Sequence, residues 1–182
     1  MATKVQAERS ERVPCQIHPE AVVCSDSKLL GPAGIKIGEG TVVHPTCMIS
    51  ALGGPIEIGK FNIFEEQVEI INNDATPLCI GNHNIFEVGA KFVSGGGVGN
   101  ANIFECQSRI GAGTQIGDGC TLGIKAVAPD GEQLPDETVI VGPSGMRHIE
   151  NGAKESHIQA IMKHIDVLKE TLPRCHHLKK SK

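Results

Sequence analysis

Three closely similar strings decide the fold of this chain: Ile58-Gly59-Lys60-Phe61-Asn62-Ile63-Phe64-Glu65, Ile80-Gly81-Asn82-His83-Asn84-Ile85-Phe86-Glu87 and Val98-Gly99-Asn100-Ala101-Asn102-Ile103-Phe104-Glu105. Through them an aliphatic residue or phenylalanine returns every six residues, as in Ile80, Phe86, Phe92, Val98, Phe104, Ile110, Ile116 and Leu122. This period is typical of a triangular β-helix, because each six-residue unit forms one short strand and three units complete a coil. The sequence therefore predicts an all-β solenoid, a left-handed parallel β-helix of hexapeptide repeats over residues 15–145.

Stacked coils bring equivalent residues into columns about 4.8 Å apart. The three strings predict an interior column of Phe64, Phe86 and Phe104, with an amide ladder of Asn62, Asn84 and Asn102 beside it. They also predict an outer acidic column of Glu65, Glu87 and Glu105. The glycine that follows each leading apolar residue is expected to supply a positive φ at a tight corner.

The repeat predicts six coils and a partial seventh. We expect it to leave the regular path through residues 129–135 and to return at residues 139–142. Beyond it, an amphipathic helix is predicted over residues 153–172 and is expected to end before Pro173. Its apolar stripe consists of Ile158, Ile161, Met162, Ile165, Leu168 and Leu172.

The favoured interpretation of this helix is that its stripe packs along one face of the prism, and the alternative is a partner-binding helix. The ends of the chain look different from its middle. Residues 1–14 are predicted to be a flexible N-terminus, and residues 173–182 a basic, solvated tail.

Composition excludes several classes of function. The formal net charge of −4 gives no basic field for nucleic acid. No apolar stretch approaches the ~20 residues of a membrane span, which argues against direct membrane insertion. The seven cysteines form no CxxC pair, which favours reduced thiols and a cytosolic chain.

Two enzyme classes use this kind of fold. The string Asn62-Ile63-Phe64-Glu65 resembles the Asn-x-Gln-Asp string of the γ-class carbonic anhydrases, whose zinc is held by three histidines. In that register the ligand places fall at Ile70, Val88 and Val93, all aliphatic, so we expect no metal, no cofactor and no catalysis. The Arg-x-Asp tripeptide that pairs subunits in trimeric relatives is missing near residues 30–32, which predicts that the chain is not a homotrimer.

Hexapeptide acyltransferases need a histidine general base, and His83 is the candidate here. We interpret it as a surface residue, because no acceptor-binding loop accompanies it. The column of Glu65, Glu87 and Glu105 could act as paired carboxylates, but we favour solvated side chains or a surface that meets a basic partner.

A closer resemblance rests on three strings: Glu65-Glu66-Gln67 with Ile70-Ile71-Asn72, Asn84-Ile85-Phe86-Glu87-Val88-Gly89, and Leu172-Pro173 with His176-His177-Leu178-Lys179-Lys180. Together they resemble the dynactin subunit 6 family. Dynactin subunit 5, a second β-helix subunit of dynactin, is an alternative. The predicted C-terminal helix and the His176-His177-Leu178-Lys179-Lys180 tail argue against it.

The resemblance implies a non-catalytic subunit of the dynactin pointed-end complex. It also implies partners: dynactin subunit 5, actin-related protein 11 and the large pointed-end subunit. The expected location is the cytoplasm and cytoskeleton, with microtubules and centrosomes reached through dynactin. The implied role is to support dynein-driven transport and the attachment of cargo and adaptors.

Overall fold

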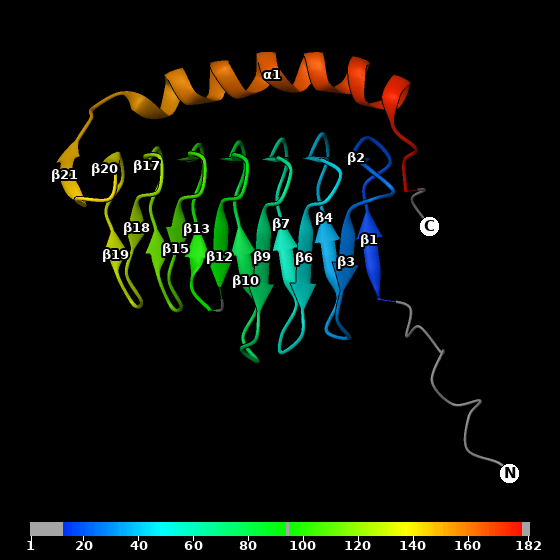
Figure 1. The fold of residues 1–182 in the computed structure, drawn as a ribbon, viewed down its shortest axis with the longest axis horizontal. Helices are drawn as coiled ribbons and strands as arrows, with labels where there is room; N and C mark the ends of the chain where they lie inside the picture. Colours follow the sequence, from blue (N-terminus) through cyan, green and yellow to red (C-terminus); the bar gives the residue numbers. More distant parts are fainter. Residues whose placement is uncertain (1–12, 94, 180–182) are drawn as a thin grey trace, which may run out of the picture.

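The computed structural model describes residues 13–93 and 95–179. Over these residues the backbone winds into a left-handed parallel β-helix of triangular section (Figure 1). One long helix, α1 (Ala153–Cys175), runs along its outside from one end to the other. The predicted fold class is confirmed, while the predicted flexible N-terminus lies almost wholly outside the described residues.

Each coil contributes one strand to each of three sheets, which form the faces of the prism. The first face contains β1 (Cys15–Ile17), β4 (Ile35–Ile37), β7 (Ile56–Ile58), β10 (Leu78–Ile80), β13 (Gly97–Val98), β16 (Gln115–Ile116) and β19 (Gln133–Leu134). The second face contains β2 (Val22–Val23), β5 (Val42–Val43), β8 (Ile63–Phe64), β11 (Ile85–Phe86), β14 (Ile103–Phe104), β17 (Thr121–Leu122), β20 (Thr138–Val141) and the antiparallel β21 (Met146–Ile149). The third face contains β3 (Lys28–Leu30), β6 (Met48–Ala51), β9 (Glu69–Asn72), β12 (Lys91–Val93), β15 (Arg109–Ile110) and β18 (Val127–Ala128).

The inward side chains of the second face form a continuous column along the prism. The pairing of β8 with β11 and of β11 with β14 places Phe64, Phe86 and Phe104 in register, and all three are fully buried. Their rings are stacked, with centroids 5.0 Å apart for the first pair and 4.4 Å for the second. A narrow interior suits this arrangement, because stacked flat rings fill the column at the strand spacing. The predicted phenylalanine column is therefore present.

The predicted amide ladder is present in the corner between the first and second faces. Asn62, Asn84 and Asn102 are each 0% exposed. The Nδ2 group of Asn84 donates to Oδ1 of Asn62 at 3.0 Å, and that of Asn102 donates to Oδ1 of Asn84 at 2.9 Å. The same oxygens also accept the backbone N–H groups of Asn84 and Asn102. Buried amides can occupy this corner because their polar groups are hydrogen-bonded.

The structure corrects the reason for the corner glycines. Gly59, Gly81 and Gly99 do not have positive φ, but a Cβ on any of them would collide with the carbonyl oxygen of the equivalent glycine in the next coil. The positive φ occurs two residues later, as at Phe61 (54°) and His83 (56°). Glycine is therefore required here by the close approach of stacked backbones rather than by conformational freedom.

The six-residue step also continues where a departure was expected. Ile110 pairs with Ala128, and Ile116 pairs with Leu134. Leu122 pairs with Ile140, which completes the series. The prediction of an irregular stretch over residues 129–135 is wrong, because the small side chain of Ala128 still fills an interior position and β19 lies within the stretch. The strands make six complete coils and a partial seventh, as predicted.

Candidate functional site

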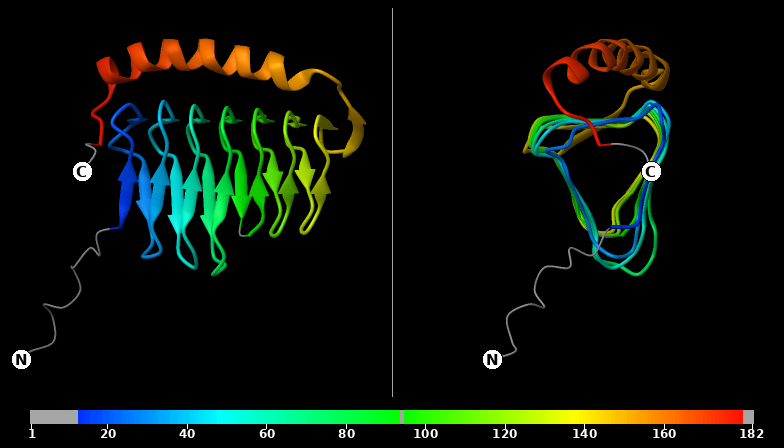
Figure 2. Two further views of the ribbon diagram at one scale, coloured as in Figure 1. Left: turned by 180° about the vertical axis from the view of Figure 1, so that it is seen from behind. Right: turned by 90° about the vertical axis from the view of Figure 1, so that its right-hand side faces the viewer.

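The second face carries a column of outward apolar residues, one on each of five neighbouring strands. Its members are Val22, Val42, Ile63, Ile85 and Ile103. They belong to the same apolar cluster as Ile161, Ile165, Leu168 and Leu172 of α1. Figure 2, in its view along the prism axis, shows α1 lying over this face, and no other described helix covers the remaining two faces.

The predicted packing of α1 against the prism is thus observed, with two corrections. Ile158 is only half-buried and lies outside the apolar cluster. The helix also continues through Pro173 to Cys175 rather than ending at Leu172. Proline lacks a backbone N–H, so Pro173 removes one backbone hydrogen bond from the last turn of the helix. The backbone N–H of His176 still donates to Leu172 O at 2.8 Å.

Polar contacts fasten the beginning of α1 to the last coils. The Nζ of Lys154 lies 2.6 Å from Oδ2 of Asp118, and Nδ1 of His157 lies 2.8 Å from the carbonyl oxygen of Ala101. Burial alone would raise the pKa of Asp118, but hydrogen bonds from Lys154 and Asn100 outweigh it and lower that pKa below its ordinary value. These contacts fix where the helix crosses the prism.

A solvated C-terminal tail was expected. The structure shows instead that the tail pairs with the first coil. Leu178 forms an antiparallel bridge with Cys24. The N–H of Ser25 donates to His177 O, and the N–H of Lys179 donates to Val23 O, both at 2.7 Å. At the other end, β21 pairs antiparallel with β20. The second face is therefore closed at both ends, whereas β1, β19, β3 and β18 end their sheets with an edge that no described strand pairs.

The three residues assigned to the lost zinc-ligand places do not share one surface. Ile70 is fully buried on the inward side of β9, while Val88 and Val93 are 37% and 38% exposed. The outward neighbour of Val93 on the adjacent strand is Ile71. Successive side chains of a strand point to opposite faces, so Ile70 and Val93 lie on different sides of this sheet. In the described part of the chain, no three His, Cys, Asp or Glu side chains converge as a metal-ligand set.

The column of glutamates has a structural role that the pattern alone did not reveal. An oxygen of Glu65 accepts the backbone N–H of Val88 at 3.1 Å, Glu87 accepts that of Cys106 at 3.1 Å, and Glu105 accepts that of Ile124 at 2.8 Å. Burial and the nearby Glu87 raise the pKa of Glu65. The expectation of simply solvated carboxylates is wrong, because each side chain joins its coil to the next. The signal was available in the sequence, since each glutamate directly follows an interior phenylalanine and precedes a turn.

His83 is half-buried and packs against a neighbouring ring. Its ring stacks on that of Phe61, with centroids 5.4 Å apart, and Nζ of Lys169 in α1 lies 5.8 Å from the Phe61 centroid. Burial lowers the pKa of His83. The stacking supports a structural role for His83 beside Phe61, which in turn contacts α1, and does not favour the general base of an acyltransferase.

A second histidine, His44, is more deeply placed in the opposite corner. Its Nδ1 lies 3.0 Å from Oε1 of Glu66, while the buried Nε2 has no hydrogen-bond partner among the described residues. Burial acts to raise the pKa of Glu66, but the hydrogen bond to His44 contributes to a net lowering.

All seven cysteines are free thiols, and burial raises the pKa of Cys24 and of Cys120 to about 11, which makes both unreactive at neutral pH.

No protein-family model matches the chain. A dynactin subunit 6 from Nematostella vectensis is 38% identical over 172 residues, which cover 88% of this chain and 90% of the relative. The chain belongs to the dynactin subunit 6 family. Members of this family from Xenopus tropicalis and Danio rerio are 34% and 33% identical, over 91% and 96% of this chain and 85% and 92% of the relatives.

Solved structures show the same architecture as this member of the dynactin subunit 6 family. A putative acetyltransferase from Bacillus cereus superposes with a TM-score of 0.76 at 15% identity, over 87% of this chain and 92% of the neighbour. A hexapeptide transferase family protein from Anaplasma phagocytophilum gives a TM-score of 0.74 at 12% identity, over 88% and 94% of the two chains. At these identities the likeness concerns the fold alone.

In the described part of the chain, α1 lacks the apolar length needed to cross a membrane.

Proposed function

We propose that the chain is a non-catalytic structural subunit of dynactin. The observation that carries this proposal is the 38% identity to a dynactin subunit 6 over 88% of the chain. The β-helix is compatible with a structural role, because its columns of asparagines and glutamates are hydrogen-bonded from one coil to the next. His83, the candidate general base, is stacked against Phe61. A rigid prism of this kind suits a spacer within a larger assembly.

The proposal extends to the place of the subunit. It would sit in the pointed-end complex beside dynactin subunit 5, with actin-related protein 11 and the large pointed-end subunit nearby. The unpaired outer edges of the first and third faces offer backbone donors and acceptors to a second β-helix. In this position the subunit would support dynein-driven microtubule transport and the attachment of cargo and adaptors, in the cytoplasm and at the cytoskeleton, including centrosomes.

Light scattering on the isolated and co-expressed chains tests this proposal. The isolated chain is expected to be mainly monomeric, and co-expression with dynactin subunit 5 is expected to give a stable heteromeric complex. The physical reason is that open strand edges favour a partner that can continue the sheets. A stable homotrimer that the second subunit leaves unchanged would refute the structural role and return the enzyme classes to consideration.

A further inference from the structure

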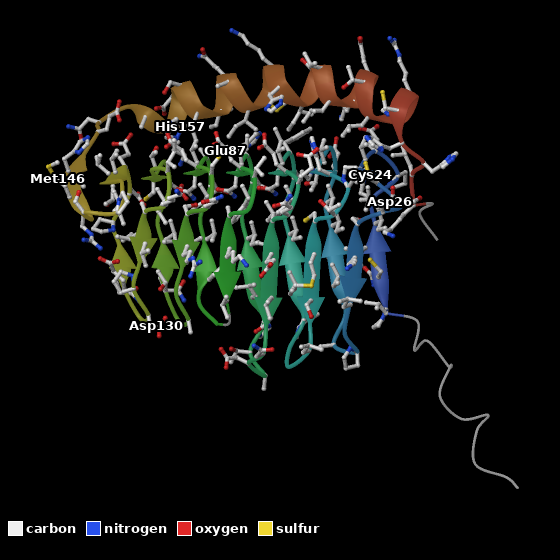
Figure 3. The ribbon with its side chains drawn as sticks, viewed as in Figure 1. Cys24, Asp26, Glu87, Asp130, Met146 and His157 are labelled. Carbon is white, nitrogen blue, oxygen red and sulfur yellow. The ribbon has the colours of Figure 1, made fainter. Side chains whose placement is uncertain are left out.

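The C-terminal tail lies across the second-face edge of the first coil. Leu178 forms an antiparallel bridge with Cys24, close to the C-terminal end of α1 (Figure 3). The side chain of Leu178 packs against the apolar cluster that joins α1 to the second face. We call residues 177–179 the strap. They cover an edge that the regular coils would otherwise leave open.

The strap is held by few contacts. Among the described residues it makes one bridge, whereas at the other end β21 pairs four residues with β20. The Nζ group of Lys179 adds a hydrogen bond to Ser25 O at 2.8 Å on the exposed surface. Each hydrogen bond contributes only about 0.5–1.5 kcal/mol net. The strap can therefore open while the coil beneath it stays folded.

The backbone groups that the strap covers are self-complementary. The N–H of Ser25 donates to the strap, and Val23 O accepts from it, one on each side of Cys24. If Cys24 of one copy lay opposite Cys24 of a second copy, each Ser25 N–H would donate to Val23 O of the other copy. This is the pattern that Cys24 and Leu178 make now. A second copy related by a two-fold axis would thus satisfy the same groups.

The rest of the first coil also lacks a neighbour at this end of the prism. No described strand pairs with the outer edge of β1 or β3. Among the described residues, the apolar side chains that pack against the main core but are only partly buried all belong to residues 13–33: Val13, Cys15, Ile17, Ala21, Leu29 and Ala33. A copy stacked on this end would remove apolar surface from water. The strap prevents such stacking, because it lies where the next strand of the second face would lie.

We propose that the strap is an autoinhibitory contact that keeps two copies of the chain from pairing end to end through their first coils. A closed strap occupies the edge beside Cys24 and keeps the chain monomeric. An open strap lets this edge pair with the same edge of a second copy about a two-fold axis. Strap opening is a property of the isolated chain and does not depend on the proposed function.

Sedimentation velocity on variants of the full chain tests this device. Leu178→Asp combined with Lys179→Pro should open the strap, because the pair puts a carboxylate against the apolar cluster and removes the N–H that binds Val23 O. This double variant should dimerise at least about tenfold more tightly than the unaltered chain. His177→Ala is the matched control and should stay monomeric, because its side chain is exposed and the strap uses its backbone oxygen. A folded double variant that remains monomeric overturns the proposal.

Cross-linking identifies the edge that pairs. In the dimer the two Cys24 residues would form a non-hydrogen-bonded pair with Cα atoms about 4.5 Å apart, which is within disulfide range. Diamide takes up the two electrons and two protons that the two thiols lose. With the exposed thiols removed by Cys79→Ser and Cys175→Ser, it should link the double variant through Cys24 and leave Cys24 of the unaltered chain reduced. A dimer that peptide mapping shows to lack this link overturns the proposal.

Amide hydrogen exchange on the unaltered chain decides the question even if the double variant unfolds. The N–H of Ser25 donates to the strap, whereas that of Cys24 donates to Val43 O within the β-helix. Opening of the strap exposes only the first of these groups. The amide of Ser25 should therefore exchange at least about tenfold faster than that of Cys24, after correction for their intrinsic rates. Equal protection of the two amides would show that the strap does not open on its own, and would overturn the proposal.

Discussion

At the scale of single residues, the interior asparagines decide how one coil is held on the next. Asn84 donates to Asn62 and to the carbonyl of Gly99 and accepts two hydrogen bonds from Asn102, all without exposure to solvent. The side chain is shielded from bulk solvent, so its removal leaves its partners without these bonds. Such a ladder therefore specifies register as well as stability, because a shifted coil would leave several polar groups unpaired.

Asn84→Ala should lower the free energy of unfolding by about 3 kcal/mol or more, since each buried polar group left unpaired costs about 1–3 kcal/mol. Urea unfolding measures the loss. Asn100→Ala is the matched control, because Asn100 stands in a half-exposed ladder where water can replace its bonds, and it should cost about 1 kcal/mol or less. Equal losses for the two variants would contradict an interior role for the ladder.

The sequence pattern predicted the inward-facing columns of the prism well, but it predicted the contacts of the outward side chains poorly. The columns of Phe86 and Asn84 follow from their spacing, because an interior position repeats with the coil. The outward column that includes Ile63 and Ile85 was also present in the sequence, one residue before each phenylalanine. It was not recognised as the seat of α1, since the hexapeptide period describes only the inward side chain. The place of each glutamate before a turn was the signal for the hydrogen bond that it accepts from a backbone N–H of the next coil, but the six-residue spacing alone does not reveal that bond.

At the scale of elements, α1 closes one face of the prism. Ile161 is 2% exposed within the apolar contact between α1 and the second face. Ile161→Asp should destabilise the chain by about 3 kcal/mol or more, because it removes apolar burial and places a carboxylate in an apolar cluster. Thermal unfolding measures the loss, and limited proteolysis should cut α1 first. Val167→Asp, on the outer side of the same helix at 58% exposure, should change stability by no more than about 0.5 kcal/mol. Similar effects of the two changes would show that α1 does not pack as described.

The ion pair of Lys154 and Asp118 gives the attachment of α1 a pH dependence. The pKa of Asp118 is lowered in the folded chain, so its stabilising contribution is present above the unfolded pKa and is lost as pH falls through the folded pKa. The pKa of Lys154 is raised by its hydrogen bond to Asp118, so that contribution is lost only as pH rises through the folded pKa of the lysine, above its ordinary value.

Lys154→Met should cost about 0.5–1 kcal/mol near neutral pH, the usual range for a partly exposed pair. The difference from the unaltered chain should shrink as pH falls below the ordinary aspartate pKa of about 4 and toward the lowered pKa of Asp118. Thermal melts across pH 3–8 measure this. Lys163→Met removes an exposed lysine from the same helix and should give no pH-dependent difference. A penalty for Lys154→Met that stays constant down to pH 3 would argue against the pair.

At the scale of the whole molecule, the prism has surfaces of different kinds. The second face is covered by α1 and closed at both ends by β21 and Leu178. On the first and third faces, no described strand pairs with the end strands and no described helix covers the sheet. The sequence predicted the prism, the helix and their order along the chain. It did not predict closure of the ends, because β21 and the pairing of Leu178 depend on where α1 begins and stops relative to the coils.

The central claim is that the chain is a structural subunit of dynactin, and its most direct test is mass spectrometry of the proteins that co-purify with it from native cytosol. The account predicts that dynactin subunits are recovered with the chain in fixed ratio, with dynactin subunit 5 among them, through gentle washing and sedimentation as a large complex. Recovery of the chain alone, or as a homotrimer free of dynactin subunits, would contradict the claim.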